Sequence, residues 1–154
     1  MDTDRQFVIF QLASGHYALD IASVQEIIRL PTLTQVPQAL PCVVGITNLR
    51  SSIVPVLDLR RRCGLPAGEP TAATRVVVVQ QAGYNLGLIV DSVDEVTIIP
   101  TSAVEPVAGI VQDGREHKLL RGVARLEDRL VLLLDLAKVV AQDAQVDLAA
   151  LAAA

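Results

Sequence analysis

Few side chains in this chain of 154 residues have the types and spacing that catalysis or metal binding requires. The two histidines, His16 and His117, have no second histidine or cysteine at the spacing of metal ligands. Cys42 and Cys63 form no CxxC motif, so we expect buried free thiols rather than a disulfide or a zinc site. The sequence motifs of serine hydrolases, zinc proteases and nucleotide-binding loops are absent. These patterns predict no enzyme activity, no cofactor and no metal.

The elements that position any functional residue follow from an internal duplication. Residues 24–31 recur 69 residues later at 93–100, and residues 45–59 recur 77 residues later at 122–136. The change of shift places an insertion of 8 residues between the two blocks of the second copy. Two copies are too few for a solenoid and predict two related subdomains, with a pseudo-twofold relation and a shared core.

Charged residues at repeated positions are the stronger candidates for function. Glu26 and Glu95 are equivalent in the repeat, which favours a structural role common to both copies. Arg50 lies at a hairpin where the second copy has Glu127. An arginine suits the recognition of a carboxylate, inside the fold or across an interface. We expect Arg50 to pair with Glu26 and to remain able to contact a partner.

Composition limits the possible partners. Half of the residues are hydrophobic (51%) but only 3% are aromatic, so the core must be aliphatic. A net charge of −4 argues against nucleic acid, which requires a cationic surface. The N-terminus is acidic, and the longest aliphatic runs are far shorter than the ~18 residues that span a membrane. We expect a soluble cytoplasmic protein without membrane insertion.

Runs of β-branched residues between Gly, Pro and charged turns predict short strands, as in β-barrels rather than a parallel sheet. The expected strands are 5–12, 16–19, 25–30, 43–50 and 53–57 in the first copy, and 75–80, 84–91, 93–99, 119–127 and 129–134 in the second.

Two aspartates are expected to cap short helices, Asp58 before 59–63 and Asp135 before a C-terminal helix that reaches about residue 142. The run Arg60-Arg61-Arg62 is expected to form a solvated face of the first helix. The remaining segments are a linker near 65–73, a longer loop at 106–118 and an alanine-rich tail at 143–154.

Several motifs occur together in a characteristic order. They are Gly15-x-Tyr17-x-Leu19, Val24-x-Glu26-Ile27, Gly45-Ile46-x-Asn48-Leu49-Arg50, the run Ile53 to Leu59, Gly87 to Asp91 followed by Val93, and Leu133-Leu134-Asp135. This combination resembles the CheW-like domain, the adaptor of bacterial chemosensory arrays. The resemblance implies a mainly β fold of two pseudo-symmetric SH3-like five-stranded β-barrels that share a hydrophobic core, with short helices and a C-terminal helix. It implies a single domain over residues 5–142.

The same resemblance implies a non-catalytic adaptor. Such a scaffold couples the cytoplasmic tips of methyl-accepting chemoreceptors to the regulatory domain of a CheA-type histidine kinase, and it is recruited to membrane-associated receptor arrays. Carried over by motif, the partner-binding residues are Glu26, Ile27, Asn48, Arg50 and Ser51. The family pattern usually has Gly at the place of Ser51, which puts the identity of the partner in question.

Three alternatives remain at this point. The adaptor could act in a non-swimming pathway, such as twitching motility. The fold could be a small-molecule-binding double barrel, which would need convergent polar groups in a pocket between the barrels. It could also be a detached regulatory domain of the same fold, although the chain has no ATP-binding motif or receiver acid cluster.

Overall fold

The structure is a computed structural model that describes residues 4–37, 42–66, 68–81, 83–106 and 119–141. Its strands are β1 (Asp4–Leu12), β2 (Gly15–Asp20), β3 (Val24–Arg29), β4 (Val43–Leu49), β5 (Ser52–Asp58), β6 (Arg75–Gln81), β7 (Tyr84–Val90), β8 (Ser92–Pro100), β9 (Val104–Glu105), β10 (Leu120–Leu126) and β11 (Arg129–Leu134). The helices are η1 (Ile21–Ser23), α1 (Leu59–Arg62), η2 (Thr101–Ala103) and α3 (Leu136–Ala141). Most of the loop expected at 106–118 and the expected tail lie outside the described residues.

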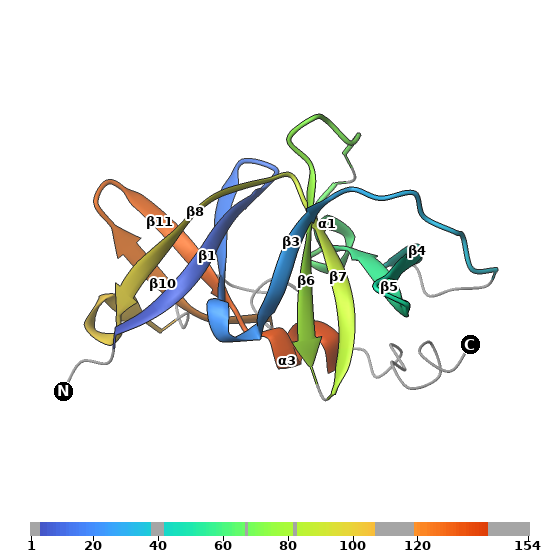
Figure 1. Cartoon of the computed structure of the whole chain (residues 1–154). Helices are drawn as coiled ribbons and strands as arrows, with labels where there is room; N and C mark the ends of the chain where they lie inside the picture. Colours follow the sequence, from blue (N-terminus) through green and yellow to red (C-terminus); the bar gives the residue numbers. More distant parts are fainter. Residues whose placement is uncertain (1–3, 38–41, 67, 82, 107–118, 142–154) are drawn as a thin grey trace.

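The strands form two sheets that lie side by side (Figure 1). One sheet, here called barrel A, has the order β8-β1-β2-β11-β10-β9. The other, barrel B, has the order β3-β6-β7-β5-β4. Apart from the two-residue strand β9, each strand of one sheet is the repeat equivalent of the strand at the same place in the other sheet. The prediction of two pseudo-symmetric SH3-like barrels is confirmed.

Each barrel combines strands from both copies of the repeat. Strand β1 of the first copy pairs with β8 of the second, and β6 of the second pairs with β3 of the first. Likewise β11 runs parallel to β2, as β5 runs parallel to β7. The first hairpin of each copy therefore lies in the barrel that the other copy completes. The segment near 65–73 connects α1, which follows β5, to β6. Both strands belong to barrel B, so this segment links the two copies of the repeat and does not separate one barrel from the other.

The two barrels share a core, and the first hairpin of each copy contributes residues to it. On β1, Phe10 and Leu12 belong to a buried cluster that also contains residues of β6 and β7. Phe7 and Ile9, on the other face of β1, are buried inside barrel A. Because both faces of β1 are covered, its sequence is a continuous apolar run rather than an alternating one. The four consecutive valines of β6 are buried in the same way.

Each barrel bends at two β-bulges in equivalent positions. The residues that the pairing registers pass over are Gln25 and Val44 in barrel B, and Asp94 and Arg121 in barrel A. In the repeat, Gln25 corresponds to Asp94 and Val44 to Arg121. A bulge bends its strand and increases the local twist, which curls a short sheet into a barrel.

Both barrels are closed by the chain that follows their bent edge strand. The backbone of Thr34 exchanges two hydrogen bonds of 2.9 Å with Ile46 of β4, and β9 pairs with β10 in the equivalent way. Equivalent glycines permit this close approach. A Cβ atom on Gly45 would lie 2.9 Å from the carbonyl oxygen of Thr34, and one on Gly122 would lie 2.7 Å from Val104 Cγ1.

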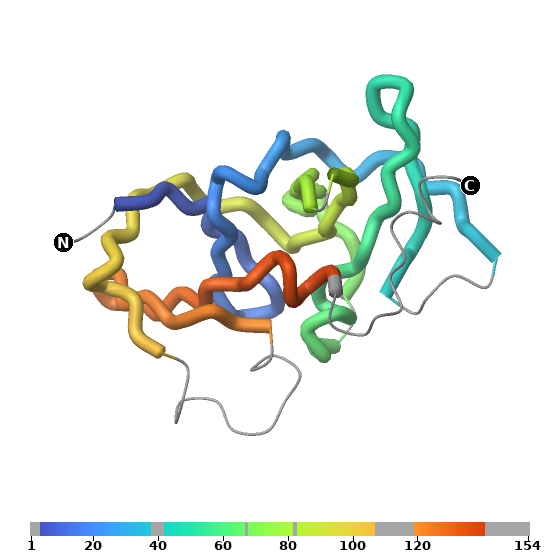
Figure 2. Tube along the Cα trace, turned by 90° about the horizontal axis from the view of Figure 1, so that it is seen from below, coloured from blue at the N-terminus to red at the C-terminus, as the bar shows by residue number. Residues whose placement is uncertain are grey.

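Aspartates cap three of the four described helices, and the caps at Asp58 and Asp135 were predicted. The Asp20 and Asp58 carboxylates accept hydrogen bonds from the backbone nitrogens of residues two positions later. Asp135 accepts one from the backbone nitrogen of Lys138 at 3.3 Å. Helix α3 follows the last strand of barrel A but packs on β6 of barrel B, and Figure 2 shows it running from one barrel towards the other.

Candidate docking surface

The predicted pair of Glu26 and Arg50 is present. Arg50 Nη1 lies 3.5 Å from Glu26 Oε2, and the Arg50 side chain is 79% exposed. Glu26 lies on β3 and Arg50 in the β4–β5 turn, so the pair joins the two ends of the barrel B sheet. An ion pair this exposed contributes at most about 1 kcal/mol to stability. Most of the guanidinium therefore stays available to a partner.

The other predicted site residues surround this pair without sharing one face. Ile27 follows Glu26 in β3, so its side chain lies on the opposite face of the strand, where it is exposed. Asn48 pairs with Ile53 in the β4–β5 ladder, and Ile53 is also exposed.

The turn between these strands has left-handed backbone at both central residues. Arg50 has a φ of 52° and Ser51 a φ of 69°. Positive φ at both positions defines a type I′ turn, which suits the twist of a two-residue hairpin. Ser51 thus keeps a backbone that favours glycine.

Barrel A carries an equivalent surface that the sequence analysis did not single out. Arg129 pairs with Glu95, the repeat equivalent of Glu26. On β8, Val96 and Ile98 face solvent on one side of the strand, and Val96 is the equivalent of Ile27. The 69-residue shift itself was the signal that could have found them. Barrel B thus presents Ile27, and barrel A presents Val96 and Ile98, as exposed aliphatic side chains on the strand that carries the glutamate of its Glu–Arg pair.

The expectation that Arg60, Arg61 and Arg62 form a solvated face is wrong. Only Arg61 is largely exposed. Arg62 is buried, and its guanidinium donates hydrogen bonds to the carbonyl oxygens of Val139, at 2.7 Å, and Lys138. Consecutive helical residues point about 100° apart, so three in a row cannot all face solvent on a helix packed against a barrel.

Arg60 makes a bidentate ion pair with Asp91, the residue between β7 and β8. The hydrogen bond to Asp91 raises the pKa of Arg60, against the opposing effect of desolvation. Asp91 also accepts a hydrogen bond of 2.8 Å from the backbone nitrogen of Ala13, in the β1–β2 turn. Asp91 therefore links α1 of barrel B to the central hairpin of barrel A.

The residues considered for catalysis and metal binding take structural positions. His16 lies in β2, with Nε2 3.5 Å from Asp94 Oδ2. Cys63 is buried and Cys42 partly buried, neither forms a disulfide, and His117 is outside the described residues. Within the described ranges, no three His, Cys, Asp or Glu side chains are grouped as metal ligands. None of the described helices has the length and hydropathy to cross a membrane.

The fold and these surfaces define a class of protein: a pair of SH3-like barrels with exchanged hairpins, a common core and matching exposed strands. The profile of the CheW-like domain family matches residues 6–144. The chain belongs to the CheW-like family of chemotaxis adaptor and scaffold proteins.

Named relatives agree with this assignment. The chain is 30% identical to the chemotaxis protein CheW of Rhizobium meliloti over 132 residues, which cover 86% of this chain and 84% of that protein. It is 29% identical to the chemotaxis protein CheW of Bacillus subtilis over 133 residues, with coverage of 86% and 85%. The crystal structure of the scaffolding protein TtCheW from Thermoanaerobacter tengcongensis superposes with a TM-score of 0.83 at 30% identity, covering 90% of this chain and 94% of that one.

Proposed function

We propose that this protein is a non-catalytic adaptor that couples the cytoplasmic tips of chemoreceptors to a CheA-type histidine kinase in a bacterial chemosensory array. Family membership supports the adaptor role. The observation that carries the proposal is the duplication of an exposed aliphatic strand beside a Glu–Arg pair, once in each barrel. A protein that bridges partners needs at least two faces, and a pseudo-twofold fold supplies two related ones.

In this proposal the regulatory domain of the kinase contacts Glu26, Ile27, Asn48, Arg50 and Ser51 on barrel B, and it reaches both faces of β3. Arg50 supplies a guanidinium that a partner carboxylate can bind, and the exposed Ile27 and Ile53 supply apolar area. Affinity in the micromolar range, about −8 kcal/mol, is sufficient because many copies act together in an array.

Calorimetry of Arg50→Glu against the regulatory domain of the cognate kinase tests this function. The turn accepts glutamate, because Glu127 has a φ of 51° at the equivalent position of barrel A. We expect the variant to keep its thermal transition and to lose at least tenfold in affinity. Arg125→Glu, an exposed arginine of barrel A that pairs with Glu105, is the matched control and should bind normally.

Two results would overturn the proposal. Wild-type protein that gives no heat of binding at high micromolar concentration would remove the kinase as a partner. Equal losses of affinity in Arg50→Glu and Arg125→Glu would show that net charge, and not the barrel B surface, determines binding.

A further inference from the structure

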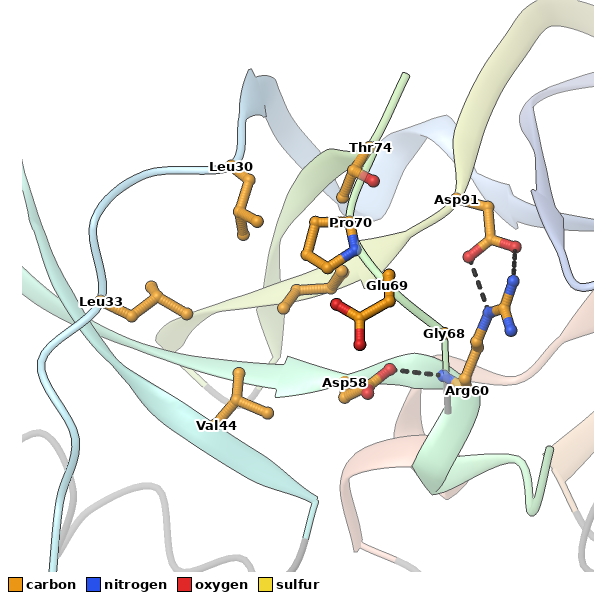
Figure 3. A pocket seen from close by; sticks show the side chains of 11 residues that line it. Leu30, Leu33, Val44, Asp58, Arg60, Gly68, Glu69, Pro70, Thr74 and Asp91 are labelled. Atoms are coloured by element: carbon orange, nitrogen blue, oxygen red, sulfur yellow. Dashed lines mark hydrogen bonds and ion pairs between the residues drawn. The ribbon is translucent and has the colours of Figure 1, made fainter. Parts of the chain in front are cut away.

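Barrel B contains a pocket of about 210 Å³ that the proposed docking surface does not include (Figure 3). The chain after β3, the beginning of α1 and the segment 68–74 surround it. Aliphatic side chains, among them Leu30, Val44 and Ile89, form much of its wall. An apolar wall with a few polar groups is typical of a binding pocket.

The pocket carries net negative charge. Its charged lining comprises the carboxylates of Asp58, Glu69 and Asp91 and the guanidinium of Arg60, which gives a formal charge of −2. Arg60 and Asp91 satisfy each other, and Arg60 also donates to the carbonyl oxygen of Pro66. Asp58 accepts a hydrogen bond from the backbone nitrogen of Arg60 and lies 3.4 Å from Arg61 Nε, so the uncompensated charge resides on Glu69. Among the described residues, none forms a hydrogen bond or an ion pair with the exposed Glu69 side chain.

The equivalent region of barrel A shows what the internal repeat places in such a pocket. The bulge residue Val44 of barrel B corresponds to Arg121 of barrel A, while Asp58 corresponds to Asp135. Arg121 lines two pockets of that surface, one of about 240 Å³ with Asp135 and one of about 220 Å³. Barrel A thus supplies an arginine of its own beside the helix-capping aspartate. Barrel B has valine at that position of its pocket wall.

We propose that the barrel B pocket binds an arginine side chain presented by a protein partner. The aliphatic stem would pack against Leu30, Val44 and Ile89, and the guanidinium would reach the unpaired carboxylate of Glu69. Arginine combines a long apolar stem with a planar group that forms paired hydrogen bonds with carboxylates. The inference does not depend on the identity of the kinase or the receptor.

The test is methyl NMR of the full chain, titrated at low salt with Nα-acetyl-arginine methylamide. The matched ligand is Nα-acetyl-citrulline methylamide, which has the same shape without the charge. We expect saturable shifts of the Leu30, Val44 and Ile89 methyl groups with the arginine ligand and at least tenfold weaker binding of citrulline. Glu69→Gln should weaken arginine binding at least threefold, whereas Glu127→Gln, an exposed carboxylate of barrel A, should not change it.

Val44→Arg provides a second, independent variant because it copies the natural state of barrel A. It should fold with an unchanged thermal transition and no longer respond to the arginine ligand. Equal binding of the arginine and citrulline ligands would overturn the proposal. So would methyl shifts that survive both Glu69→Gln and Val44→Arg, or shifts of methyl groups near surface carboxylates throughout the molecule.

Discussion

The guanidinium of Arg62 donates a hydrogen bond of 2.7 Å to the carbonyl oxygen of Val139. Arg62 ends α1, which follows the last strand of barrel B in the first copy, whereas Val139 lies in α3, which follows the last strand of barrel A. The same guanidinium donates a second hydrogen bond to the carbonyl oxygen of Lys138. Carbonyls in the last turn of a helix have no partner within the helix. The first copy therefore caps the final helix of the second.

Arg62→Ala should destabilise the protein by about 2 to 4 kcal/mol, because it removes two charged hydrogen bonds and leaves carbonyl groups of α3 buried. Urea unfolding at equilibrium measures this loss. Arg61→Ala, at the largely exposed neighbour, should cost about 0.5 kcal/mol or less. Similar losses in the two variants would contradict the capping role of Arg62.

Ser51→Gly should stabilise the protein. Non-glycine residues pay about 1 to 2 kcal/mol for left-handed backbone, and the greater unfolded-state freedom of glycine offsets part of that gain. A net increase of about 0.5 kcal/mol in the free energy of unfolding is expected. Ser52→Gly is the control, since Ser52 begins β5 and should gain nothing. If both glycine variants lose stability equally, strain at Ser51 is not significant.

Gly45→Ala and Gly122→Ala should each open one barrel. The new methyl group would meet backbone at Gly45 and a valine side chain at Gly122, at distances that force the closing segment away. We expect losses of about 1 to 3 kcal/mol, as for other overpacked sites. Hydrogen exchange gives a local readout: in Gly45→Ala, the amides of Thr34 and Ile46 should exchange faster than in the wild type. Unchanged protection there would argue against closure by this bridge.

Ile27→Asp and Val96→Asp test whether the two barrels dock separately. Both side chains are exposed, so the thermal transitions should stay within about 2 °C of the wild type. Ile27→Asp should lose the kinase regulatory domain while Val96→Asp retains it, and the double variant should not assemble with kinase and receptor together. Co-sedimentation of the three components measures this. Normal assembly of the double variant would exclude these strands from docking.

Local features of the fold were predictable because their causes are local. Asp20 and Asp58 act as helix caps through their own short side chains, and strand boundaries follow from the turns beside them. The pairing of Glu26 with Arg50 was predictable because the repeat showed where the two copies differ.

Features that depend on contacts distant in sequence were not predictable in this way. The exchange of hairpins leaves every strand with the same local pattern, so periodicity does not distinguish it from two sequential barrels. Asp91 is an example, because its partner Arg60 belongs to barrel B and its partner Ala13 belongs to barrel A. The buried position of Arg62 was missed because a charge run was interpreted without its helical geometry.

The exchange of hairpins also sets an order of events for a chain that is made from its N-terminus. Strands β3 to β7 are consecutive, so barrel B has all its strands once β7 has left the ribosome. The β1–β2 hairpin precedes these strands but pairs with β8 and β11, which are made only after β7. Pairings between distant segments form slowly. Until β8 and β11 have emerged, the first hairpin therefore has no neighbouring strand in its sheet, and it is the segment on which a nascent-chain chaperone would act.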